Sequence, residues 1–565
     1  MGSGRPEVPH ASLPRQICVA IQHHQQEEFD KARHGYLNAL AAGRRDPRLT
    51  YLLTCLEIHS GNIESAKAWF RKGVRRDIGT GRPPPPTDIA VPKAFQEALQ
   101  ADPRPVAICR KLSANLPARG EFQPILVALK AWLKFAPQDT TALERFADLA
   151  GRLGDHVLAA DLLQQAQNLD PANAVLPFKR GNALNGQGEP RQALAAYDEA
   201  ARLDGGLWAA RVNAAATLHK IGRTAAAERR LRKMLADHPR HPEVLYTLAE
   251  ILFQDGRPRE AVRYYEETVA AAPEHAAAWL HQAHAWKRLG LTRKAAQAYR
   301  QATALWPERP DIHFSLGATL HGLKDFKGAE AALACAITLD PDDPATGYLL
   351  KAVRQETVSH APRAYVEALF DRYAASFDRH MKGLLQYRIP GYLRRHLKPQ
   401  ARRRGGFDRM LDVGCGTGLA GAALRDMVRH MTGVDIAGNI LERAAGKKIY
   451  DRLVQDDFRH YLDVVSEAFE LVVAADVFIY TGDLDPVLAQ IRKRLSANGS
   501  LAFSVEKDKE SGFRLRRSGR FAHSRDYVAS LADKHGFIIE TARPVPVRME
   551  NNQWVGGILF VMTAG

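Results

Sequence analysis

The chain has few cysteines and no long apolar segment, and both absences narrow the class of protein. Only five of its 565 residues are cysteine, and none stands in a C-x-x-C pair. The five are Cys18, Cys55, Cys109, Cys335 and Cys415. An odd number of scattered cysteines argues against a disulfide framework and a zinc site. No run of about 18 apolar residues is available to span a bilayer, and residues 1–6 lack the apolar segment of a signal peptide. We therefore expect a cytoplasmic protein with no metal site and no membrane span.

Acidic residues are too few to balance the basic ones. The chain has 79 Lys and Arg residues against 63 Asp and Glu residues, which gives a net charge of +16. A basic protein favours acidic partners such as nucleic acid, phosphorylated substrates or anionic lipid. No nucleic-acid-binding module accompanies the charge, so we interpret it as a basic, arginine-rich solvated surface. An acidic or anionic partner remains the alternative, and nucleic acid stays open.

A period of 34 residues runs through much of the chain. Its glycines are Gly120, Gly154, Gly188, Gly222, Gly256 and Gly290. Alanine recurs with the same period, and a larger residue stands four positions after it, as in Ala193 and Tyr197 or Ala261 and Tyr265. Glycine turns the chain between two helices, while the small alanine lets paired helices approach each other. The period and these positions resemble the tetratricopeptide (TPR) repeat.

The TPR resemblance implies an all-helical solenoid whose concave groove holds a protein or peptide partner. A rigid spacer or a dimerisation arm is the alternative. We place TPR-like helices in residues 1–80, a proline-rich break with a linking helix in 81–103, and the main solenoid in 104–350. A linker over 351–364 then leads to a second domain over 365–565.

A strand that ends in an acidic residue and three alternate glycines marks the second domain. The segment Leu411-Asp412-Val413-Gly414-Cys415-Gly416-Thr417-Gly418 leads into a helix that begins at Leu419. Glycines at such a turn permit positive φ and let a ligand approach the backbone. The dinucleotide fingerprint G-x-G-x-x-G would need glycine at Leu419, which argues against a nucleotide-dependent oxidoreductase. The G-x-G-x-G loop resembles that of class I S-adenosylmethionine (SAM) methyltransferases.

Acidic residues follow the next predicted strands at their carboxyl ends. An acid at the tip of the second strand of a doubly wound sheet can accept both ribose hydroxyls, and Asp435 has that place. The resemblance implies that Ile440 packs against adenine and that Asp457 meets its amino group. Taken singly, each acid could instead be a helix cap or a solvated loop residue. The predicted SAM site comprises Tyr373, Asp412, Gly414, Gly416, Gly418, Asp435, Ile440, Asp457 and Asp476.

Four residues are candidates for the methyl-transfer side of the site. The segment 369–378 resembles the cap helix of small-molecule methyltransferases, in which Tyr373 would cover the methionine end of SAM; a core aromatic is the alternative. Tyr480 follows the fourth predicted strand and would line the methyl channel. We expect Arg520 to hold an anionic acceptor and His523 to act as general base, because histidine titrates near neutral pH. The alternative for His523 is a cap on the helix that begins near Arg525.

The sequence thus predicts an α + α/β multidomain protein. An all-α TPR solenoid would precede a Rossmann-like, seven-stranded methyltransferase domain, whose last strands are 537–541 and 554–562. Nearly the whole chain resembles bacterial TPR-linked SAM methyltransferases. The expected function is methyl transfer to a small molecule or protein chosen with the help of the TPR arm. A non-catalytic scaffold that retains the SAM-binding fold is the alternative.

Overall fold

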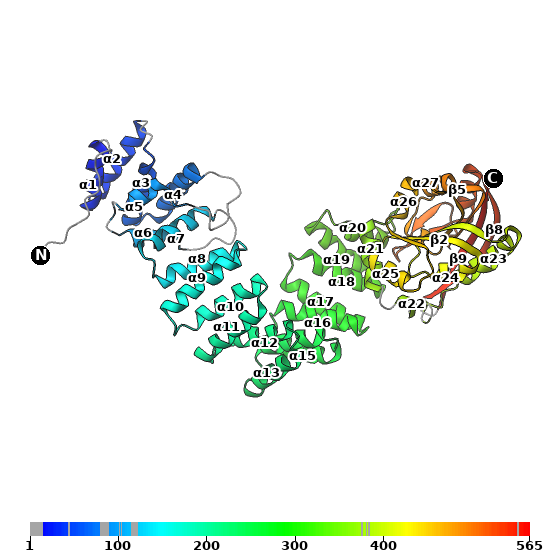
Figure 1. Ribbon diagram of the computed structural model, residues 1–565, viewed down its shortest axis with the longest axis horizontal. Coiled ribbons are helices and arrows are strands. Elements are labelled where there is room, and N and C mark those ends of the chain that lie inside the picture. The colour runs from blue at the N-terminus through cyan, green and yellow to red at the C-terminus, as the bar shows by residue number, and fades with distance from the viewer. Residues whose placement is uncertain are drawn as a thin grey trace. The chain divides into compact units, whose positions relative to one another are not determined.

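The computed structural model describes residues 15–42, 46–78, 90–100, 102, 104–114, 122–373, 377–379, 381, 383, 385–550 and 553–565. The chain forms two compact units, Met1–Ala272 and Pro273–Gly565. Figure 1 labels the helices and strands of both. This division falls within the repeats, so the last five repeat helices belong to the unit that contains the sheet. The domain limits expected from the sequence remain predictions. No described helix is long and apolar enough to cross a bilayer.

The first unit consists of helices in its described part. They are α1 (Arg15–Gln25), α2 (Phe29–Ala41), α3 (Arg48–His59), α4 (Ile63–Ile78), α5 (Lys93–Gln100), α6 (Pro105–Leu112), α7 (Gln123–Phe135), α8 (Thr140–Arg152), α9 (His156–Leu169), α10 (Val175–Gln187), α11 (Pro190–Leu203), α12 (Trp208–Lys220), α13 (Thr224–Asp237), α14 (Pro242–Gln254) and α15 (Pro258–Ala271). The second unit continues the array with α16 (Ala276–Arg288), α17 (Thr292–Leu305), α18 (Pro310–Gly322), α19 (Phe326–Leu339) and α20 (Pro344–Arg354). The predicted helical array is confirmed.

The repeat positions have the conformations that their residue types dictate. Gly188 and Gly222 adopt φ of 88° and 81° at the turns between helices, and Lys324 takes φ of 63° where the period places no glycine. Gly181 in α10 faces Tyr197 in α11 so closely that a Cβ would lie 2.6 Å from the ring. The predicted glycine Gly120 and the prolines at 83–86 lie outside the described residues.

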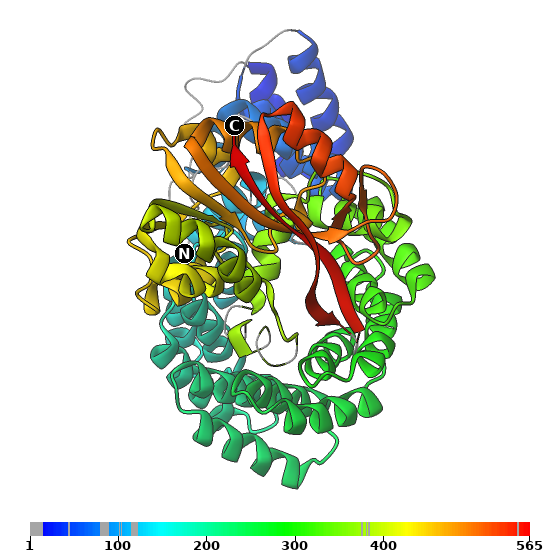
Figure 2. The same ribbon diagram turned by 90° about the vertical axis from the view of Figure 1, so that its right-hand side faces the viewer.

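The sheet of the second unit contains nine strands, two more than predicted. They are β1 (Phe407–Val413), β2 (Val428–Asp435), β3 (Arg452–Gln455), β4 (Phe469–Ala474), β5 (Leu495–Lys507), β6 (Phe513–Leu515), β7 (Phe521–His523), β8 (Phe537–Glu550) and β9 (Gln553–Ala564). Their order is β3-β2-β1-β4-β5-β7-β6, and β9 pairs antiparallel with β5 and β8. The strands lie side by side in one twisted sheet (Figure 2). Between and around them lie α21 (Arg363–Tyr373), α22 (Phe377–Arg379), α23 (Ile389–Arg404), α24 (Leu419–Leu424), η4 (Arg425–Met427), α25 (Gly438–Gly446), α26 (Phe458–Val464), η5 (Phe478–Tyr480), α27 (Asp485–Arg494) and α28 (Arg525–Lys534).

The two additional strands form a hairpin beyond the carboxyl end of β4. Glu506 of β5 pairs with Gly557 of β9 on one edge and with Ala522 of β7 on the other. The second edge is the one that β4 occupies until Ala474. The β6–β7 hairpin therefore extends the sheet over the crevice where ligands bind in doubly wound folds.

Candidate functional site

The glycine loop leaves β1 in a conformation that suits glycine. Gly414, Gly416 and Gly418 have φ of 58°, 56° and 83°. A Cβ on Gly414 would lie 2.6 Å from Val477, so the close approach of the loop to the segment after β4 also requires glycine. Gly414 and Gly416 line cavities, whereas Gly418 packs against Ile449 and Tyr450. The first two glycines thus face the site and the third supports it.

Asp412 lies beneath this loop rather than in a cavity. Its side chain is buried, and Tyr450 Oη donates a hydrogen bond to its Oδ2 at 2.6 Å. Burial raises the pKa of Asp412 to about 7. Asp412 lines neither of the cavities described below. Its predicted contact with the cofactor stays a prediction, and in the structure its side chain is held beneath the loop by Tyr450.

Asp435 is fixed at the carboxyl end of β2 by two backbone donors. Gly416 N donates to its Oδ2 at 2.8 Å, and Ala437 N donates to its Oδ1 at 3.0 Å. Burial raises the pKa of this carboxyl group. Each carboxylate oxygen has a second lone pair, so Asp435 can still accept hydroxyl groups from a ligand in the cavity that it lines.

The first cavity extends over the carboxyl ends of β1 to β4 and has an empty volume of about 610 Å³. Asp456 and Asp457 lie along it, with Ile436 and Phe458 as apolar lining. Asp457 also caps α26, because its Oδ1 accepts from Arg459 N at 2.9 Å. Ile440 is fully buried against Phe370 and Phe377 and does not line the cavity. The predicted adenine contact by Ile440 stays a prediction, and Ile436 is the isoleucine that lines the cavity.

A second cavity, with an empty volume of about 1160 Å³, adjoins the first. The two share Phe370, Asp476 and Tyr480. The second cavity also has Tyr387, Thr417, Arg520 and Arg548 in its lining. The rest of its lining is mainly apolar and includes Leu369, Phe377, Met381, Leu385, Leu419, Ala420, Ala475 and Ile479. The side chain of Tyr373 lies outside what the structure describes.

Comparison with known proteins identifies both parts of the chain. Residues 411–503 match the family model of a methyltransferase domain. Residues 184–251, 222–286 and 282–344 match models of the tetratricopeptide repeat. The chain joins tetratricopeptide repeats to a methyltransferase domain.

Two curated relatives match about a quarter of the chain. Malonyl-[acyl-carrier protein] O-methyltransferase from Methylovorus sp. (strain MP688) is 31% identical over 158 residues, which are 25% of this chain and 50% of the relative. The protein of that name from Enterobacter lignolyticus (strain SCF1) is 30% identical over 140 residues, or 25% and 53%. The chain thus spans about half the length of the curated relatives it matches.

Solved structures resemble each part separately. The TPR protein YrrB, which has an unusual peptide-binding site, is 22% identical, with 33% of this chain and 95% of that chain covered and a TM-score of 0.26. The N-methyltransferase NodS from Bradyrhizobium japonicum WM9, in complex with S-adenosyl-L-homocysteine, is 18% identical, with 35% and 97% covered and a TM-score of 0.30.

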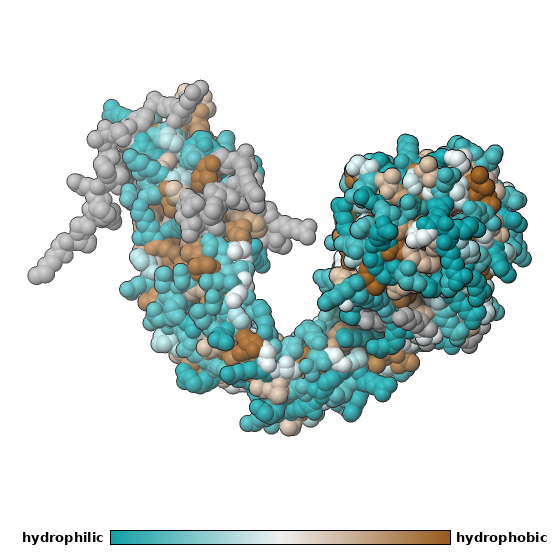
Figure 3. Space-filling view, turned by 45° about the vertical axis from the view of Figure 1, so that its right-hand side comes forward, coloured by the Kyte–Doolittle hydropathy of each residue, from teal (hydrophilic) through white to brown (hydrophobic). Residues whose placement is uncertain are grey.

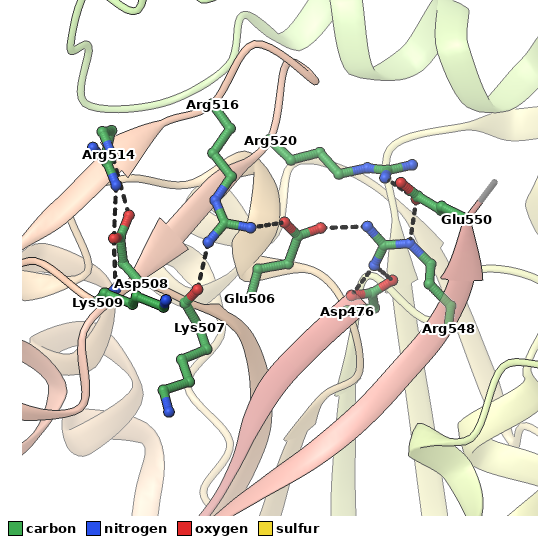
Figure 4. Close-up of polar contacts among 10 residues, drawn as sticks. All are labelled: Asp476, Glu506, Lys507, Asp508, Lys509, Arg514, Arg516, Arg520, Arg548 and Glu550. Atoms are coloured by element: carbon green, nitrogen blue, oxygen red, sulfur yellow. Dashed lines mark hydrogen bonds and ion pairs between the residues drawn. The ribbon is translucent and has the colours of Figure 1, made fainter. Parts of the chain in front are cut away.

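Three residues that line the second cavity, Asp476, Arg520 and Arg548, belong to a network of ion pairs in the methyltransferase domain. Figure 4 shows this network. At its centre the buried Arg548 donates from Nη1 to Asp476 Oδ2 at 2.9 Å, from Nε to Glu550 Oε1 at 2.7 Å, and from Nη2 to Glu506. Arg520 donates from Nη1 to the same oxygen of Glu550. Asp476 has φ of 62°, so a strained backbone presents it to both cavities. No sequence motif pointed to Arg548, which lies in β8, far along the chain from the glycine loop.

His523 does not cap α28, and its predicted role as general base stays a prediction. It is fully buried in β7, and its Nε2 faces the carbonyl oxygens of Thr481 and Gly482, both at 3.0 Å, so it must donate a proton there. Burial lowers its pKa to about 4. The cap of α28 is Ser524, whose Oγ accepts from Tyr527 N at 3.1 Å. His523 lines neither cavity.

One group in the described part of the chain could hold a metal ion, and it lies in the first unit. His24, His59 and Asp102 bring their ligand atoms within 4.8 Å of one another. His24 Nε2 and His59 Nδ1 are 3.0 Å apart, the distance of a hydrogen bond between the two rings. The expectation of no metal site therefore stays a prediction.

Proposed function

We propose that the methyltransferase domain uses SAM to methylate a carboxylate oxygen of its acceptor. The observation that carries this proposal is the composition of the second cavity. It contains an arginine able to bind an anion, and no histidine is among its described lining residues. A carboxylate suits such a cavity because it is already ionised at neutral pH and needs no base.

The first cavity has the chemistry that a nucleoside requires. Asp435 would accept the ribose hydroxyls, and Asp457 would face the adenine amino group. Ile436 and Phe458 supply apolar surface for the ring, while the glycine loop lets the ligand approach the backbone without a Cβ in the way. SAM supplies a methyl group on a sulfonium, so that an acceptor oxygen gains the methyl as the sulfur–carbon bond breaks and the sulfur keeps the electron pair.

Arg520 is the residue that we assign to the acceptor. Arg548 is only 2% exposed, and its donors are engaged with three carboxylates. Arg520 is 26% exposed and pairs through Nη1 with Glu550. A guanidinium group has five N–H donors in a planar fork that fits a carboxylate, so this bond leaves donors for an acceptor. Methylation converts the carboxylate to a neutral ester, which weakens its attraction to Arg520 and favours release.

The names of the curated relatives describe methylation on oxygen of a malonyl group, which agrees with this assignment. From these names we apply to this protein only the methylation of a carboxylate oxygen, and we do not propose that an acyl-carrier protein bears the acceptor. We further propose that the TPR repeats bind a protein or peptide that presents or regulates the acceptor, and that the protein works in the cytoplasm. The face drawn in Figure 3 is mostly hydrophilic, with scattered hydrophobic patches.

Cofactor binding is tested by calorimetry with S-adenosylhomocysteine. Asp435→Ala removes the charged acceptor for the ribose and should lower the affinity by about 30- to 150-fold, the equivalent of about 2–3 kcal/mol. Gly416→Val places a branched side chain at φ of 56° beside the cavity and should abolish binding. Asp526→Ala, in the exposed first turn of α28, is the control. Parent-like affinity in both site variants would show that the cofactor is placed wrongly.

Acceptor chemistry is tested with the malonyl thioester of N-acetylcysteamine and mass spectrometry of the methyl ester. The parent protein should form the ester, and Arg520→Gln should lose most of the transfer while it keeps its affinity for S-adenosylhomocysteine. Binding without transfer to any carboxylate tested would favour the non-catalytic scaffold.

A further inference from the structure

The β6–β7 hairpin that carries Arg520 is anchored on the last repeat helices. We propose that α18, α19 and α20 position residues of the second cavity, which we call the acceptor cavity, and are not part of a separable binding arm. This inference rests on the proposed role of Arg520. It makes Tyr348 of α20 a positioning residue for the reaction, acting through the turn at residues 516–520.

The hairpin has little support of its own from the sheet. Only two residue pairs join β7 to β5, Glu506 with Ala522 and Lys507 with His523. Strands β6 and β7 have three residues each. A two-stranded hairpin is marginally stable unless other elements pack against it. The position of Arg520 at the start of β7 therefore depends on what holds the turn.

Tyr348 holds the turn from α20. It is 3% exposed, and its Oη donates to Gly519 O at 2.9 Å. Its ring lies 4.8 Å from that of Tyr365 and 6.4 Å from that of Phe521, measured between centroids. Gly519 has φ of 75°, and a Cβ there would lie 3.0 Å from Tyr365 Oη. The residue next to Arg520 thus lies between two tyrosines, one of which belongs to the repeats.

The other two repeat helices hold the same turn through Arg517. The carbonyl oxygen of Arg517 accepts a hydrogen bond from His321 Nε2 of α18. The Arg517 guanidinium lies 4.8 Å from the centroid of the Phe326 ring in α19, within the range of a cation–π contact. Three consecutive repeat helices therefore contact the five-residue turn that ends at Arg520.

The segment after α20 holds the residues around Tyr480 in the same way. Ala361 N donates to Tyr480 O at 2.9 Å, and the carbonyl oxygen of Ser359 accepts from Gly482 N at 2.7 Å and from Asp483 N at 2.9 Å. Tyr480 lines both cavities. The end of the repeat array thus sets the positions of Arg520 and Tyr480, whose side chains contact each other and line the second cavity.

The test compares two buried tyrosines of the full-length protein. Tyr348→Phe removes only the hydrogen bond to Gly519. Tyr197→Phe removes the bond from Tyr197 Oη to Asn182 Oδ1, 2.7 Å long, in the first unit and serves as the matched control. Hydrogen exchange is followed at the amides of Arg516 and Gly519, which bond to Arg520 O and Arg516 O. Exchange there should rise about fivefold in Tyr348→Phe, since one hydrogen bond contributes about 1 kcal/mol, and should not change in Tyr197→Phe.

Kinetics with the malonyl thioester separate positioning from stability. Tyr348→Phe should raise KM for the thioester about fivefold, with parent-like affinity for S-adenosylhomocysteine. Arg517→Ala, an exposed change that cannot unfold the core, should act in the same direction. Parent-like exchange and KM in both variants would overturn the proposal. If the parent does not methylate the thioester, the assigned acceptor is wrong and hydrogen exchange alone decides whether the repeats hold the turn.

Discussion

The repeats and the methyltransferase domain differ in how far apart along the chain their contacting residues lie. In the repeats, Gly181 meets Tyr197 within one helical pair, and the same geometry returns at Gly317 and Leu333. In the domain, the wall of the acceptor cavity joins Asp476, Arg520 and Arg548 from three separate elements. The position of a residue within the 34-residue period is therefore enough to predict its packing role in the repeats. A residue of the cavity wall takes its role from partners that spacing does not reveal.

The two regions also differ in how deeply their arginine ion pairs are buried. Repeat arginines such as Arg257 pair with carboxylates at the surface, where Arg257 is 34% exposed. Arg548 is 2% exposed and faces Asp476, Glu506 and Glu550. A buried ion network is costly to break because the remaining charges are left without a partner. The contrast predicts different outcomes for the same substitution.

The largest expected effect is the difference in the free energy of unfolding between Arg548→Met and the comparison variant Arg257→Met. Arg548→Met should cost about 3–5 kcal/mol because three carboxylates lose their common cation, whereas Arg257→Met should cost less than about 1 kcal/mol. Native-state hydrogen exchange reports the local free energy of opening, in β5 for the first variant and in α15 for the second. Addition of Glu506→Gln and Glu550→Gln to Arg548→Met should restore part of the loss. Equal effects at the two arginines would mean that burial does not distinguish these regions.

Sequence reasoning reached the parts of the site that lie close to the glycine loop. Asp435 and Asp457 line the first cavity as expected, because the carboxyl ends of parallel strands meet at one edge. Arg548 and Ile436 were missed. Arg548 comes from an antiparallel strand late in the chain. Ile436 lies between β2 and α25, whereas the predicted Ile440 is buried within α25.

The added hairpin explains why His523 is buried. Its strands have three residues each, too short for an alternating pattern to appear in the sequence. The sequence therefore did not reveal that residues 521–523 form a strand. Pairing with β5 buries His523.

An intermediate effect is expected for the pH dependence of stability in His523→Gln. Above pH 6.5, His523 is neutral in both the folded and the unfolded protein. As pH falls from 6.5 toward 4, the histidine is protonated in the unfolded chain but stays neutral in the folded protein, where its pKa is about 4. The folded state therefore loses stability over this range. The parent should thus lose about 2 kcal/mol more than the variant between pH 7 and pH 5. Denaturant unfolding at each pH measures this, with kcat followed alongside.

The neighbouring cap supplies the control for that measurement. Ser524→Ala should cost about 1 kcal/mol at every pH, because the lost bond to Tyr527 N does not titrate. His523→Gln should keep kcat, since the amide can still donate to Thr481 and Gly482 carbonyls. A fall in kcat of about 100-fold with an unchanged pH profile would support His523 as the general base.

The smallest effect distinguishes a helix cap from a ligand contact. Asp457 caps α26 through Arg459 N at 2.9 Å, and Asp325 caps α19 through Gly328 N at 3.0 Å. Asparagine is an equally good cap, so Asp→Asn at either position should change stability by only a few tenths of a kcal/mol. Asp457→Asn should nevertheless weaken S-adenosylhomocysteine binding about fivefold, because a charged acceptor for the adenine amino group becomes neutral. Asp325→Asn should not affect binding. If Asp457→Asn binds S-adenosylhomocysteine like the parent in calorimetry, Asp457 serves only as a helix cap, as Asp325 does. Asp456 would then be the next acid to test for a contact with adenine.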